Sequence, residues 1–241
     1  MNHKCMFTEE VELATTLGEI DFDAVSQDLE GLGYAEVSTG GGEDGLMAAV
    51  HAVGRQVGAH GFGCMHLRAT GSELWLGRHT ESLTDGATPL RYFALGCLVP
   101  AEQGGATHLY DGSEAAHILR ALYPETREVH IRYRSAYRPE ISDHPLIVEH
   151  KLYGAVLRYR SASEYNSMIT RPTGMSEPDL YAVIENALGA SLVHVHTWRA
   201  GDLLIVDNHR MLHSRAPFAG LRHMLRVRYD DPVHQTATLA E

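Results

Sequence analysis

The pattern of apolar and polar positions predicts a small number of helices. Apolar residues recur at helical spacing in four segments, at 21–33, 43–58, 113–123 and 176–189. Ser113 and Ser176 open the last two segments and are the expected N-caps, and Pro178 suits a first helical turn. Glycines end the first segment, and Gly189 is expected just past the end of the last helix.

The other apolar stretches are short and often alternate with polar residues, as strands do. They lie at 34–37, 62–70, 72–79, 91–100, 129–137, 145–151, 155–161, 191–198, 202–208 and 223–231. Many short strands with a few helices indicate a β-sandwich or barrel with helices packed outside it. We therefore expect an α+β protein with an all-β core. It should be a single domain over 1–241 with a short helical N-terminal region.

Composition narrows the class of partner. Twenty basic and thirty-one acidic residues give a net charge of −11, which argues against a nucleic-acid-binding protein. The chain has no apolar run of membrane-spanning length and no signal-peptide pattern at its start, so we expect a cytoplasmic protein without membrane contact. Three widely spaced cysteines predict neither a disulfide framework nor a zinc cluster. Sixteen histidines make a metal site worth testing.

His79 and Glu81 are the first candidates for metal ligands. On a strand, residues i and i+2 point to the same side, so these two side chains could reach one ion. A redox iron site often uses two histidines and one carboxylate and leaves its other positions open. The third ligand should come from another strand, and His213 is the candidate. The H-x-E spacing alone is weak, because a solvated strand would show it equally well.

Four longer stretches carry further signals. They are "HTES" at 79–82, "VPAEQGGATHLYDG" at 99–112, a hairpin-like sequence at 143–165, and "WRAGDLLIVDNHRMLHSRAPFAGLRHMLR" at 198–226. In this order they are similar to H-x-D/E, strand–GG-x-T–strand, H-P-[VL]-[VI]…G…L and W-x-x-G-D-x-x-x-x-D-N…H-x-R…R-x-x-x-R. The set resembles the iron(II)/2-oxoglutarate-dependent oxygenases of the taurine dioxygenase and clavaminate synthase type, and it spans about 74–229.

This resemblance implies a double-stranded β-helix, or jelly-roll, core with flanking helices. It also implies that His79, Glu81 and His213 hold iron(II). Thr107 and Arg222 would bind the distal carboxylate of the cosubstrate 2-oxoglutarate, since a buried carboxylate needs a forked cation and a hydroxyl donor. O2 would be the other cosubstrate.

The resemblance implies a reaction class as well. Oxidative decarboxylation of 2-oxoglutarate to succinate and CO2 would accompany oxidation of an unactivated C–H bond in a small molecule. Hydroxylation is the expected outcome, and desaturation, cyclisation and epoxidation stay open. Arg226 would support the cosubstrate or meet an anionic group of the substrate. Glu81 argues against halogenation, because halogenating members lack this carboxylate, and it favours amino-acid-like substrates of specialised metabolism.

Alternatives stay open beside this interpretation. Arg222, Arg226 and Arg228 alternate along one strand, so one or two of them could simply form its outer face, paired with Asp230 or Asp231. His194 and His196 form an H-x-H, which would suit a cupin-like metal-dependent isomerase or ligand-binding protein. No carboxylate with matching context accompanies that pair, so we expect ordinary strand-face histidines. A non-catalytic family member is the third hypothesis.

The remaining polar residues of the last motif are expected to be structural. Trp198 belongs to a turn, and Asp207 and Asn208 should fix the next turn through side-chain to backbone hydrogen bonds. His209 lies four residues before His213, and the context favours His213 as the ligand.

A lid is expected around 138–176, between the core strands. Arg171, Tyr165 and Asn166 in this range could contact a substrate. Because the chain is short for the resembled family, the site could be less covered and could accept a bulky or carrier-bound substrate.

Overall fold

The computed structural model describes residues 3–6, 20–40, 42–83, 89–134, 141–161 and 168–230. The helices are α1 (Phe22–Gly31), α2 (Glu43–Gln56), α3 (Gly112–Leu122), the 3-10 helix η1 (Pro124–Glu128) and α4 (Glu177–Ala190). The strands are β1 (His3–Met6), β2 (Tyr34–Ser38), β3 (Gly61–Ser72), β4 (Leu76–His79), β5 (Tyr92–Val99), β6 (Gln103–Gly104), β7 (Thr107–Asp111), β8 (His130–Arg134), β9 (Ile141–Pro145), β10 (Ile147–His150), β11 (Gly154–Leu157), β12 (Met168–Thr170), β13 (Leu192–His196), β14 (Asp202–Asp207), β15 (Met211–Arg215) and β16 (Phe218–Asp230).

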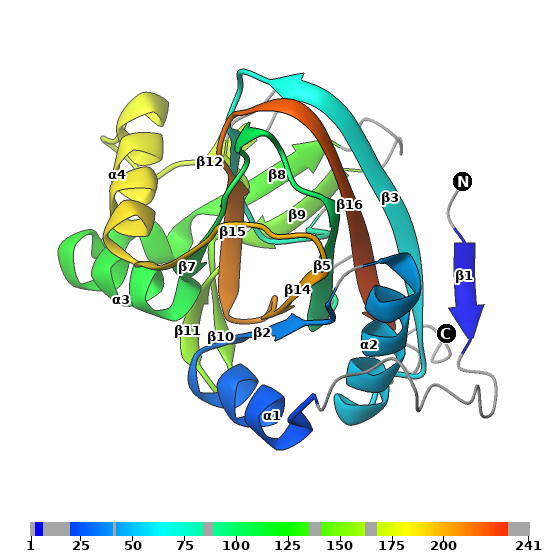
Figure 1. Cartoon of the computed structure of the whole chain (residues 1–241). Coiled ribbons are helices and arrows are strands. Elements are labelled where there is room, and N and C mark those ends of the chain that lie inside the picture. Colours follow the sequence, from blue (N-terminus) through cyan, green and yellow to red (C-terminus); the bar gives the residue numbers. More distant parts are fainter. Residues whose placement is uncertain are drawn as a thin grey trace.

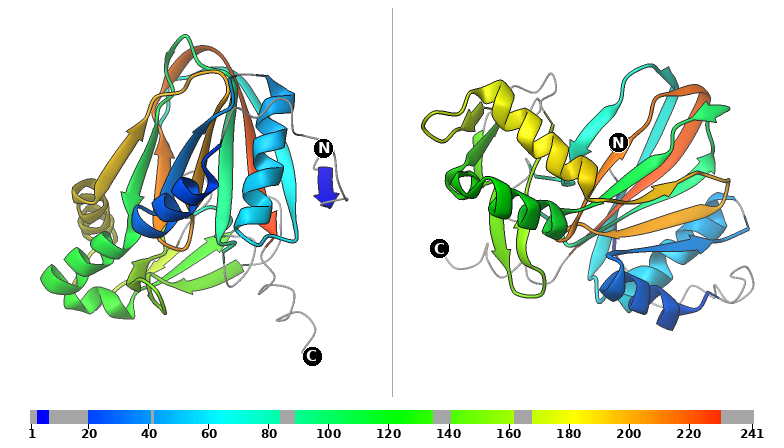
Figure 2. Two further views of the ribbon diagram at one scale, coloured as in Figure 1. Left: turned by 60° about the horizontal axis from the view of Figure 1, so that its bottom comes forward. Right: turned by 90° about the vertical axis from the view of Figure 1, so that its left-hand side faces the viewer.

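Two antiparallel sheets form the centre of the molecule (Figure 1). The larger sheet has the order β1-β3-β16-β5-β14-β2, with β6 paired to β16, and the smaller sheet has the order β13-β7-β15-β4. Helices α1 and α2 lie against the larger sheet, whereas α3 and α4 lie on the opposite side of the molecule (Figure 2). The predicted combination of helices and antiparallel strands is confirmed.

Three apolar clusters hold these layers together. One joins α1 and α2 to the larger sheet, and a second joins α3 and α4 to the smaller sheet and its neighbours. The third lies between the two sheets and includes Phe93, Leu109 and Met224. Each fully buried side chain of this kind contributes roughly 1.5–3 kcal/mol by leaving water.

The long strand β16 shows how the sequence assigns its two faces. Leu225, Val227 and Tyr229 pack in the cluster with α2, so their side chains lie on the outer face of the sheet. Residues at alternate positions point the other way, toward the space between the sheets. Arg222, Met224, Arg226 and Arg228 therefore share the inner face. The alternative that these arginines form the outer face is wrong.

The predicted helices are confirmed, with two corrections at their ends. The N-cap of α3 is Asp111, not Ser113, because the Asp111 carboxylate accepts hydrogen bonds from the backbone N–H of Ser113 and Glu114 at 2.8 and 3.2 Å. Gly189 lies inside α4, which ends at Ala190. Ser176 is the N-cap of α4, as predicted.

The predicted strands are largely confirmed, although the short strands β1, β6 and β12 lie outside the predicted ranges and β9 overlaps them only at Pro145. Strand β15 also lies outside them. Its sequence, "MLHSR", does not alternate regularly between apolar and polar residues.

The expected lid range, 138–176, contains β9, β10, β11 and β12 in its described parts, and Tyr165 and Asn166 lie outside the described residues. Among the helices that the structure describes, none has the length and apolar character needed to cross a membrane.

Candidate active site

His79 and Glu81 converge, although not for the reason that the sequence suggested. His79 is the last residue of β4, and Glu81 lies in the turn that follows, so the two side chains are not neighbours on one strand face. The turn includes Ser82, whose φ of 58° is in the left-handed region. The Glu81 carboxylate still comes back toward His79, with Oε2 3.8 Å from the His79 Nε2 atom.

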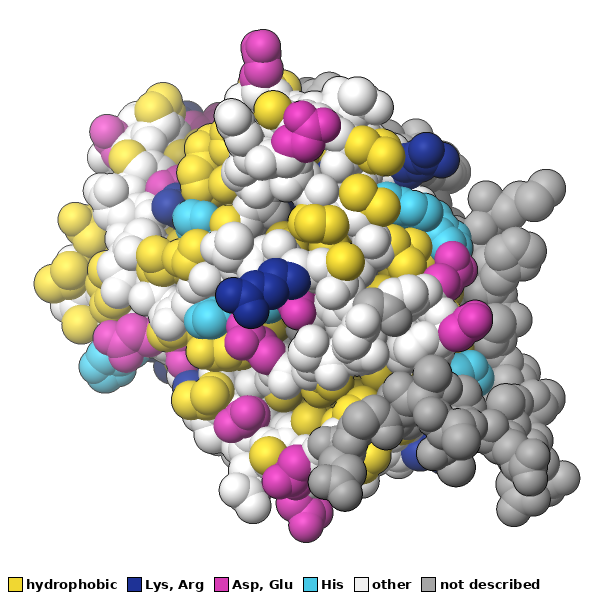
Figure 3. Space-filling model, in the orientation of Figure 1, with side chains coloured by type: hydrophobic (Ala, Val, Ile, Leu, Met, Phe, Trp, Pro, Cys, Tyr) yellow, Lys and Arg dark blue, Asp and Glu magenta, His cyan; other side chains and the backbone are white. Residues whose placement is uncertain are grey.

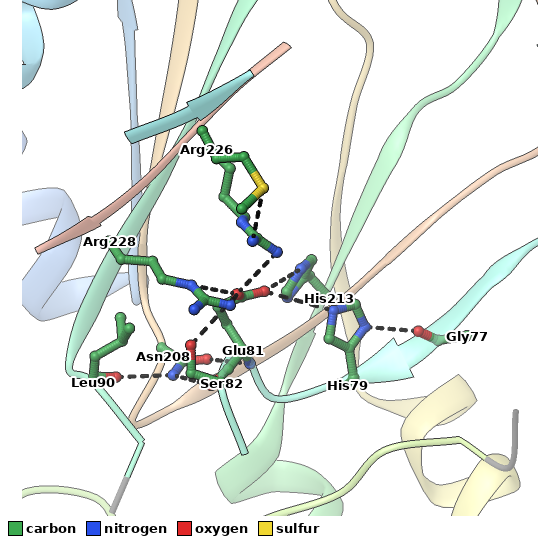
Figure 4. Close-up of polar contacts among 10 residues, drawn as sticks. Gly77, His79, Glu81, Ser82, Leu90, Asn208, His213, Arg226 and Arg228 are labelled. Atoms are coloured by element: carbon green, nitrogen blue, oxygen red, sulfur yellow. Dashed lines mark hydrogen bonds and ion pairs between the residues drawn. The ribbon is translucent and has the colours of Figure 1, made fainter. Parts of the chain in front are cut away.

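His213 completes this cluster from β15. Strand β15 pairs with β4 in a register that sets His213 opposite His79, and the two ring centroids are 4.1 Å apart. The His213 Nε2 atom lies 3.9 Å from Glu81 Oε2. The three potential ligand atoms all lie within 4.8 Å of one another, and all three residues are buried. Figure 4 shows both imidazoles directed toward the Glu81 carboxylate. We call His79, Glu81 and His213 the inner cluster.

The protonation chemistry of the inner cluster suits a cation. The His79 Nδ1 atom is 2.8 Å from the Gly77 carbonyl oxygen, and donation to that oxygen leaves the Nε2 lone pair toward Glu81. Burial and the adjacent His79 hold the pKa of His213 well below its usual value, so this imidazole is neutral. Its other ring nitrogen, Nδ1, is buried and has no hydrogen-bond partner among the described residues. Two imidazoles and a carboxylate form the donor set of a non-haem iron(II) site.

Asn208 fixes the backbone of Glu81, a role that the sequence did not predict. Its Oδ1 atom accepts a hydrogen bond from the Glu81 N–H at 2.8 Å, and its Nδ2 atom donates to the carbonyl oxygens of Glu81 and Leu90 at 3.0 and 2.8 Å. Asn208 is fully buried. The predicted side-chain to backbone bond does occur at Asp207, which accepts the His209 N–H at 2.9 Å. The Asn208 amide thus holds the turn that carries a potential ligand.

Arg228 is a second site residue that the sequence did not single out. It forms a forked pair with one carboxylate oxygen, Glu81 Oε1, at 2.9 Å from Nε and 2.5 Å from Nη2 (Figure 4). The Arg226 Nη1 atom lies 3.4 Å from the same oxygen. Burial alone would raise the pKa of Glu81, but contact with His79 and the charges of Arg226 and Arg228 hold it well below its usual value. Glu81 is therefore an anion, with Oε2 left toward the imidazoles.

Arg222 lies on the same face of β16, two inward positions from Arg226. Arg222 is 7% exposed, and its guanidinium lies over the Phe218 ring, 5.8 Å from the ring centroid. Among the described residues no carboxylate or hydrogen-bond partner of Arg222 is found. Burial and the charge of Arg215 lower its pKa to about 10, so it is still a cation at neutral pH. A buried guanidinium without a counter-charge is costly, and a bound anion would remove that cost.

Thr107 begins β7 and is buried, close to a segment that only glycine can form. Its Oγ1 accepts a hydrogen bond from the Trp198 indole N–H at 3.1 Å, so Trp198 orients this hydroxyl. Just before it, Gly104 has a φ of 73°, and a Cβ there would lie 2.3 Å from the Pro217 carbonyl oxygen. A Cβ on Gly105 would lie 3.5 Å from Arg222 Cδ. Gly104 thus lets the chain pass close to the Pro217 backbone, and Gly105, with a φ of 76°, continues the turn beside Arg222.

His209 takes no part in the inner cluster. Its Nε2 atom lies 2.8 Å from the Pro89 carbonyl oxygen. Arg171, the described residue among the three expected lid contacts, lies between β12 and α4.

The pair His194 and His196 is accompanied by a carboxylate after all. The Glu36 Oε1 atom of β2 lies 2.6 Å from both His194 Nε2 and His196 Nδ1 of β13. The two histidines lie on a strand, as expected, but the sequence context did not reveal this carboxylate, because strands far apart in the sequence meet here. We call Glu36, His194 and His196 the seam cluster.

Comparison with known proteins shows the family to which this chain belongs. The model of the taurine catabolism dioxygenase TauD, TfdA family matches residues 19–228. The chain therefore belongs to this family, as the sequence motifs predicted. Iron(II), 2-oxoglutarate and O2 are the cofactor and cosubstrates of the family.

The individual relatives have low sequence identity to this chain, between 18% and 27%. The chain is 27% identical over 169 residues to 3-((Z)-2-isocyanoethenyl)-1H-indole synthase of Fischerella ambigua, a match that covers 62% of this chain and 61% of that enzyme. It is similar in fold to PvcB from Pseudomonas aeruginosa, with a TM-score of 0.68, 20% identity, and coverage of 89% of this chain and 82% of PvcB. A taurine dioxygenase from Burkholderia xenovorans matches with a TM-score of 0.65, 18% identity, and coverage of 92% and 85%.

Proposed function

We propose that this protein is an iron(II)- and 2-oxoglutarate-dependent oxygenase that oxidises a C–H bond of a small, amino-acid-derived molecule. The whole chain would act as one catalytic domain on a double-stranded β-helix core. Bound iron(II), with 2-oxoglutarate and O2, supplies the oxidising chemistry and yields succinate and CO2.

The inner cluster is the proposed iron site. His79 and His213 would each present Nε2, and Glu81 would present Oε2. The two ion pairs on Glu81 Oε1 support this assignment, since they keep the carboxylate ionised and direct one oxygen toward the imidazoles. The hydrogen bond from His79 to the Gly77 carbonyl oxygen supports it further by fixing the tautomer of a ligand.

Arg222 is the proposed anchor for the distal carboxylate of 2-oxoglutarate, with the Thr107 hydroxyl as a second contact. Its buried, uncompensated charge supports this role, because a carboxylate is the anion that a guanidinium binds most specifically. Arg226 lies beside Glu81, and about two strand steps of ~6.8 Å each separate it from Arg222. We assign Arg226 to the metal end, where it would face the keto-acid group of the cosubstrate or an anionic group of the substrate.

Relatives support the proposed substrate class. The Fischerella enzyme is named for an isocyanoethenyl indole, and one PvcB structure is described as that of an oxygenase from an isonitrile synthetic pathway. Indole-bearing amino-acid derivatives, with and without an isonitrile group, are therefore the first substrates to test. Hydroxylation would add one oxygen atom. The ethenyl group in the name of the relative makes loss of two hydrogen atoms the competing outcome, with the carboxyl group of the amino-acid derivative leaving as CO2, and mass spectrometry separates the two outcomes.

The buried His79, Glu81 and His213 set, with ligand atoms within 4.8 Å, is the single observation on which the proposal rests. Anaerobic addition of iron(II) and 2-oxoglutarate to the wild type should produce a weak visible charge-transfer band. Glu81→Ala and His213→Ala should lose the band while keeping the wild-type circular dichroism spectrum. A wild type that gives no band and forms no succinate would overturn the assignment.

A further inference from the structure

The seam cluster brings two imidazoles and a carboxylate to one point on the outside of the molecule. Glu36 Oε1 lies 2.6 Å from His194 Nε2 and 2.6 Å from His196 Nδ1. The potential ligand atoms lie within 4.8 Å of one another, as in the inner cluster. The three residues thus offer the same donor types as the proposed iron site, on different strands.

The position of the seam cluster sets it apart from the inner cluster. Glu36 belongs to β2, the last strand of the larger sheet, and the two histidines belong to β13, the first strand of the smaller sheet. A pocket of about 450 Å³ opens at this point, with Ser38, Thr197 and Arg199 among its lining residues. Figure 3 shows histidine, acidic and basic side chains gathered near the centre of the face on which β2 lies in Figure 1. Solvent ions therefore reach the cluster directly.

The surroundings of His196 resemble those of a metal-bound histidine. Its ring is buried, and its second nitrogen, Nε2, lies 3.5 Å from the carboxylate oxygen Asp202 Oδ2. In the part of the chain that the structure describes, this nitrogen has no hydrogen-bond partner. The Arg199 backbone N–H donates to the same Asp202 oxygen at 2.7 Å, which fixes that carboxylate. Trp198 packs edge-on against the ring, with centroids 4.2 Å apart. A carboxylate behind a histidine is a common feature of metal sites, where it orients the ring and raises its basicity.

We propose that the seam cluster is a second metal site, for a divalent transition ion of the zinc type. Glu36, His194 and His196 would supply the protein ligands, and the pocket side would stay open to water or a small ligand. Tetrahedral bonds of about 2.05 Å place ligand atoms roughly 3.3 Å apart, so the 2.6 Å contacts must lengthen slightly. Glu36 provides this movement, because its side chain is 44% exposed.

A bound ion would join the edges of the two sheets. In the described residues β2 pairs only with β14, and β13 pairs only with β7, so no backbone pairing joins β2 to β13. Three bonds to one ion would link the strands directly. Since the ion would bind the folded state and not the unfolded one, zinc should raise the melting temperature in a concentration-dependent way.

The proposal is independent of the oxygenase function and is tested without turnover. In His79→Ala/His213→Ala, which lacks the inner histidines, isothermal titration with Zn²⁺ should still detect one equivalent. Adding Glu36→Gln, which keeps a hydrogen-bond acceptor but removes the charge, should abolish that equivalent. Adding His130→Ala instead, an exposed histidine of β8 paired with Asp143 of β9, should leave it unchanged.

If the variant His79→Ala/His213→Ala does not fold, a spectroscopic measurement on other proteins tests the same proposal. Cobalt(II) added to the wild type and to Glu36→Gln should differ by one equivalent and by the visible bands of a tetrahedral histidine-ligated site. Equal zinc stoichiometry in proteins with and without Glu36, or an unchanged melting temperature of the wild type in zinc, would overturn the proposal.

Discussion

The inner cluster and the seam cluster contain the same residue types but differ in what surrounds the carboxylate. In the inner cluster, Arg226 and Arg228 form ion pairs with one oxygen of Glu81. The other oxygen lies 3.8 and 3.9 Å from the two imidazoles. In the seam cluster, both imidazoles contact the same Glu36 oxygen at 2.6 Å. Two partly buried arginines therefore keep the inner cluster open for an ion, whereas hydrogen bonds close the seam cluster until an ion competes with them.

Burial separates the two clusters as well. The inner residues are 4–8% exposed and lie between the sheets, where a low dielectric strengthens every charge interaction. The Glu36 side chain is 44% exposed, so water and salt weaken its interactions with the histidines. The same ligand set thus suits protected redox chemistry in one place and reversible ion binding in the other.

The largest expected effect is on the rate of succinate formation, and it should differ between substitutions in the two clusters. His213→Ala should reduce iron-dependent succinate formation to the level of protein without added iron, because a ligand to the metal is lost. His194→Ala, in the seam cluster, should change the rate by no more than about twofold, as expected for a substitution away from the site. Succinate measured by mass spectrometry distinguishes them, and equal losses in both variants would contradict the difference in role.

The sequence singled out the three residues of the inner cluster, but the structure changes the reason why Glu81 lies beside His79. The long motif at 198–226 led to His213, and family order linked it to His79 and Glu81. The expected shared strand face was wrong, because β4 ends at His79. The turn that returns Glu81 depends on hydrogen bonds with Asn208, 127 positions away, and no local pattern encodes such a contact.

Other contacts could not be predicted because they depend on packing between distant elements. Alternation along β16 left two possible faces for Arg228, and only the packing of Leu225 and Val227 against α2 decides between them. Glu36 lies 158 positions from His194, so the seam cluster has no signature in either segment.

The second prediction concerns the cosubstrate. Arg222→Met should raise the KM for 2-oxoglutarate by roughly 10- to 150-fold, since a charge-assisted contact to a carboxylate contributes about 1.5–3 kcal/mol. Arg199→Met, which changes an arginine beside the seam cluster, should leave that KM unchanged. Steady-state kinetics at varied 2-oxoglutarate decides the question, and an unaltered KM in Arg222→Met would exclude Arg222 as the anchor.

The third prediction tests whether the ion pairs with Arg226 and Arg228 are what distinguishes Glu81 from Glu36. Arg228→Met should weaken iron(II) binding about 10- to 100-fold, as is usual when a partner of a metal ligand is removed. The matched control is Arg132→Met, which removes an arginine from an exposed ion pair with Asp143. Anaerobic titration followed by the charge-transfer band gives both affinities. If Arg228→Met binds iron as tightly as the control, the ion pair does not position Glu81.

The smallest expected effect lies in the seam cluster, where Asp202 stands behind His196 at 3.5 Å. Asp202→Asn keeps an acceptor for the Arg199 N–H but removes the charge that would raise the basicity of the imidazole. Zinc affinity should therefore fall about 10-fold, the lower end of the range for such partners, because the contact is long. Iron affinity should not change, since Asp202 does not contact the inner cluster. A parallel loss of iron and zinc binding would mean that Asp202 acts through the fold, and the two clusters would then not be independent.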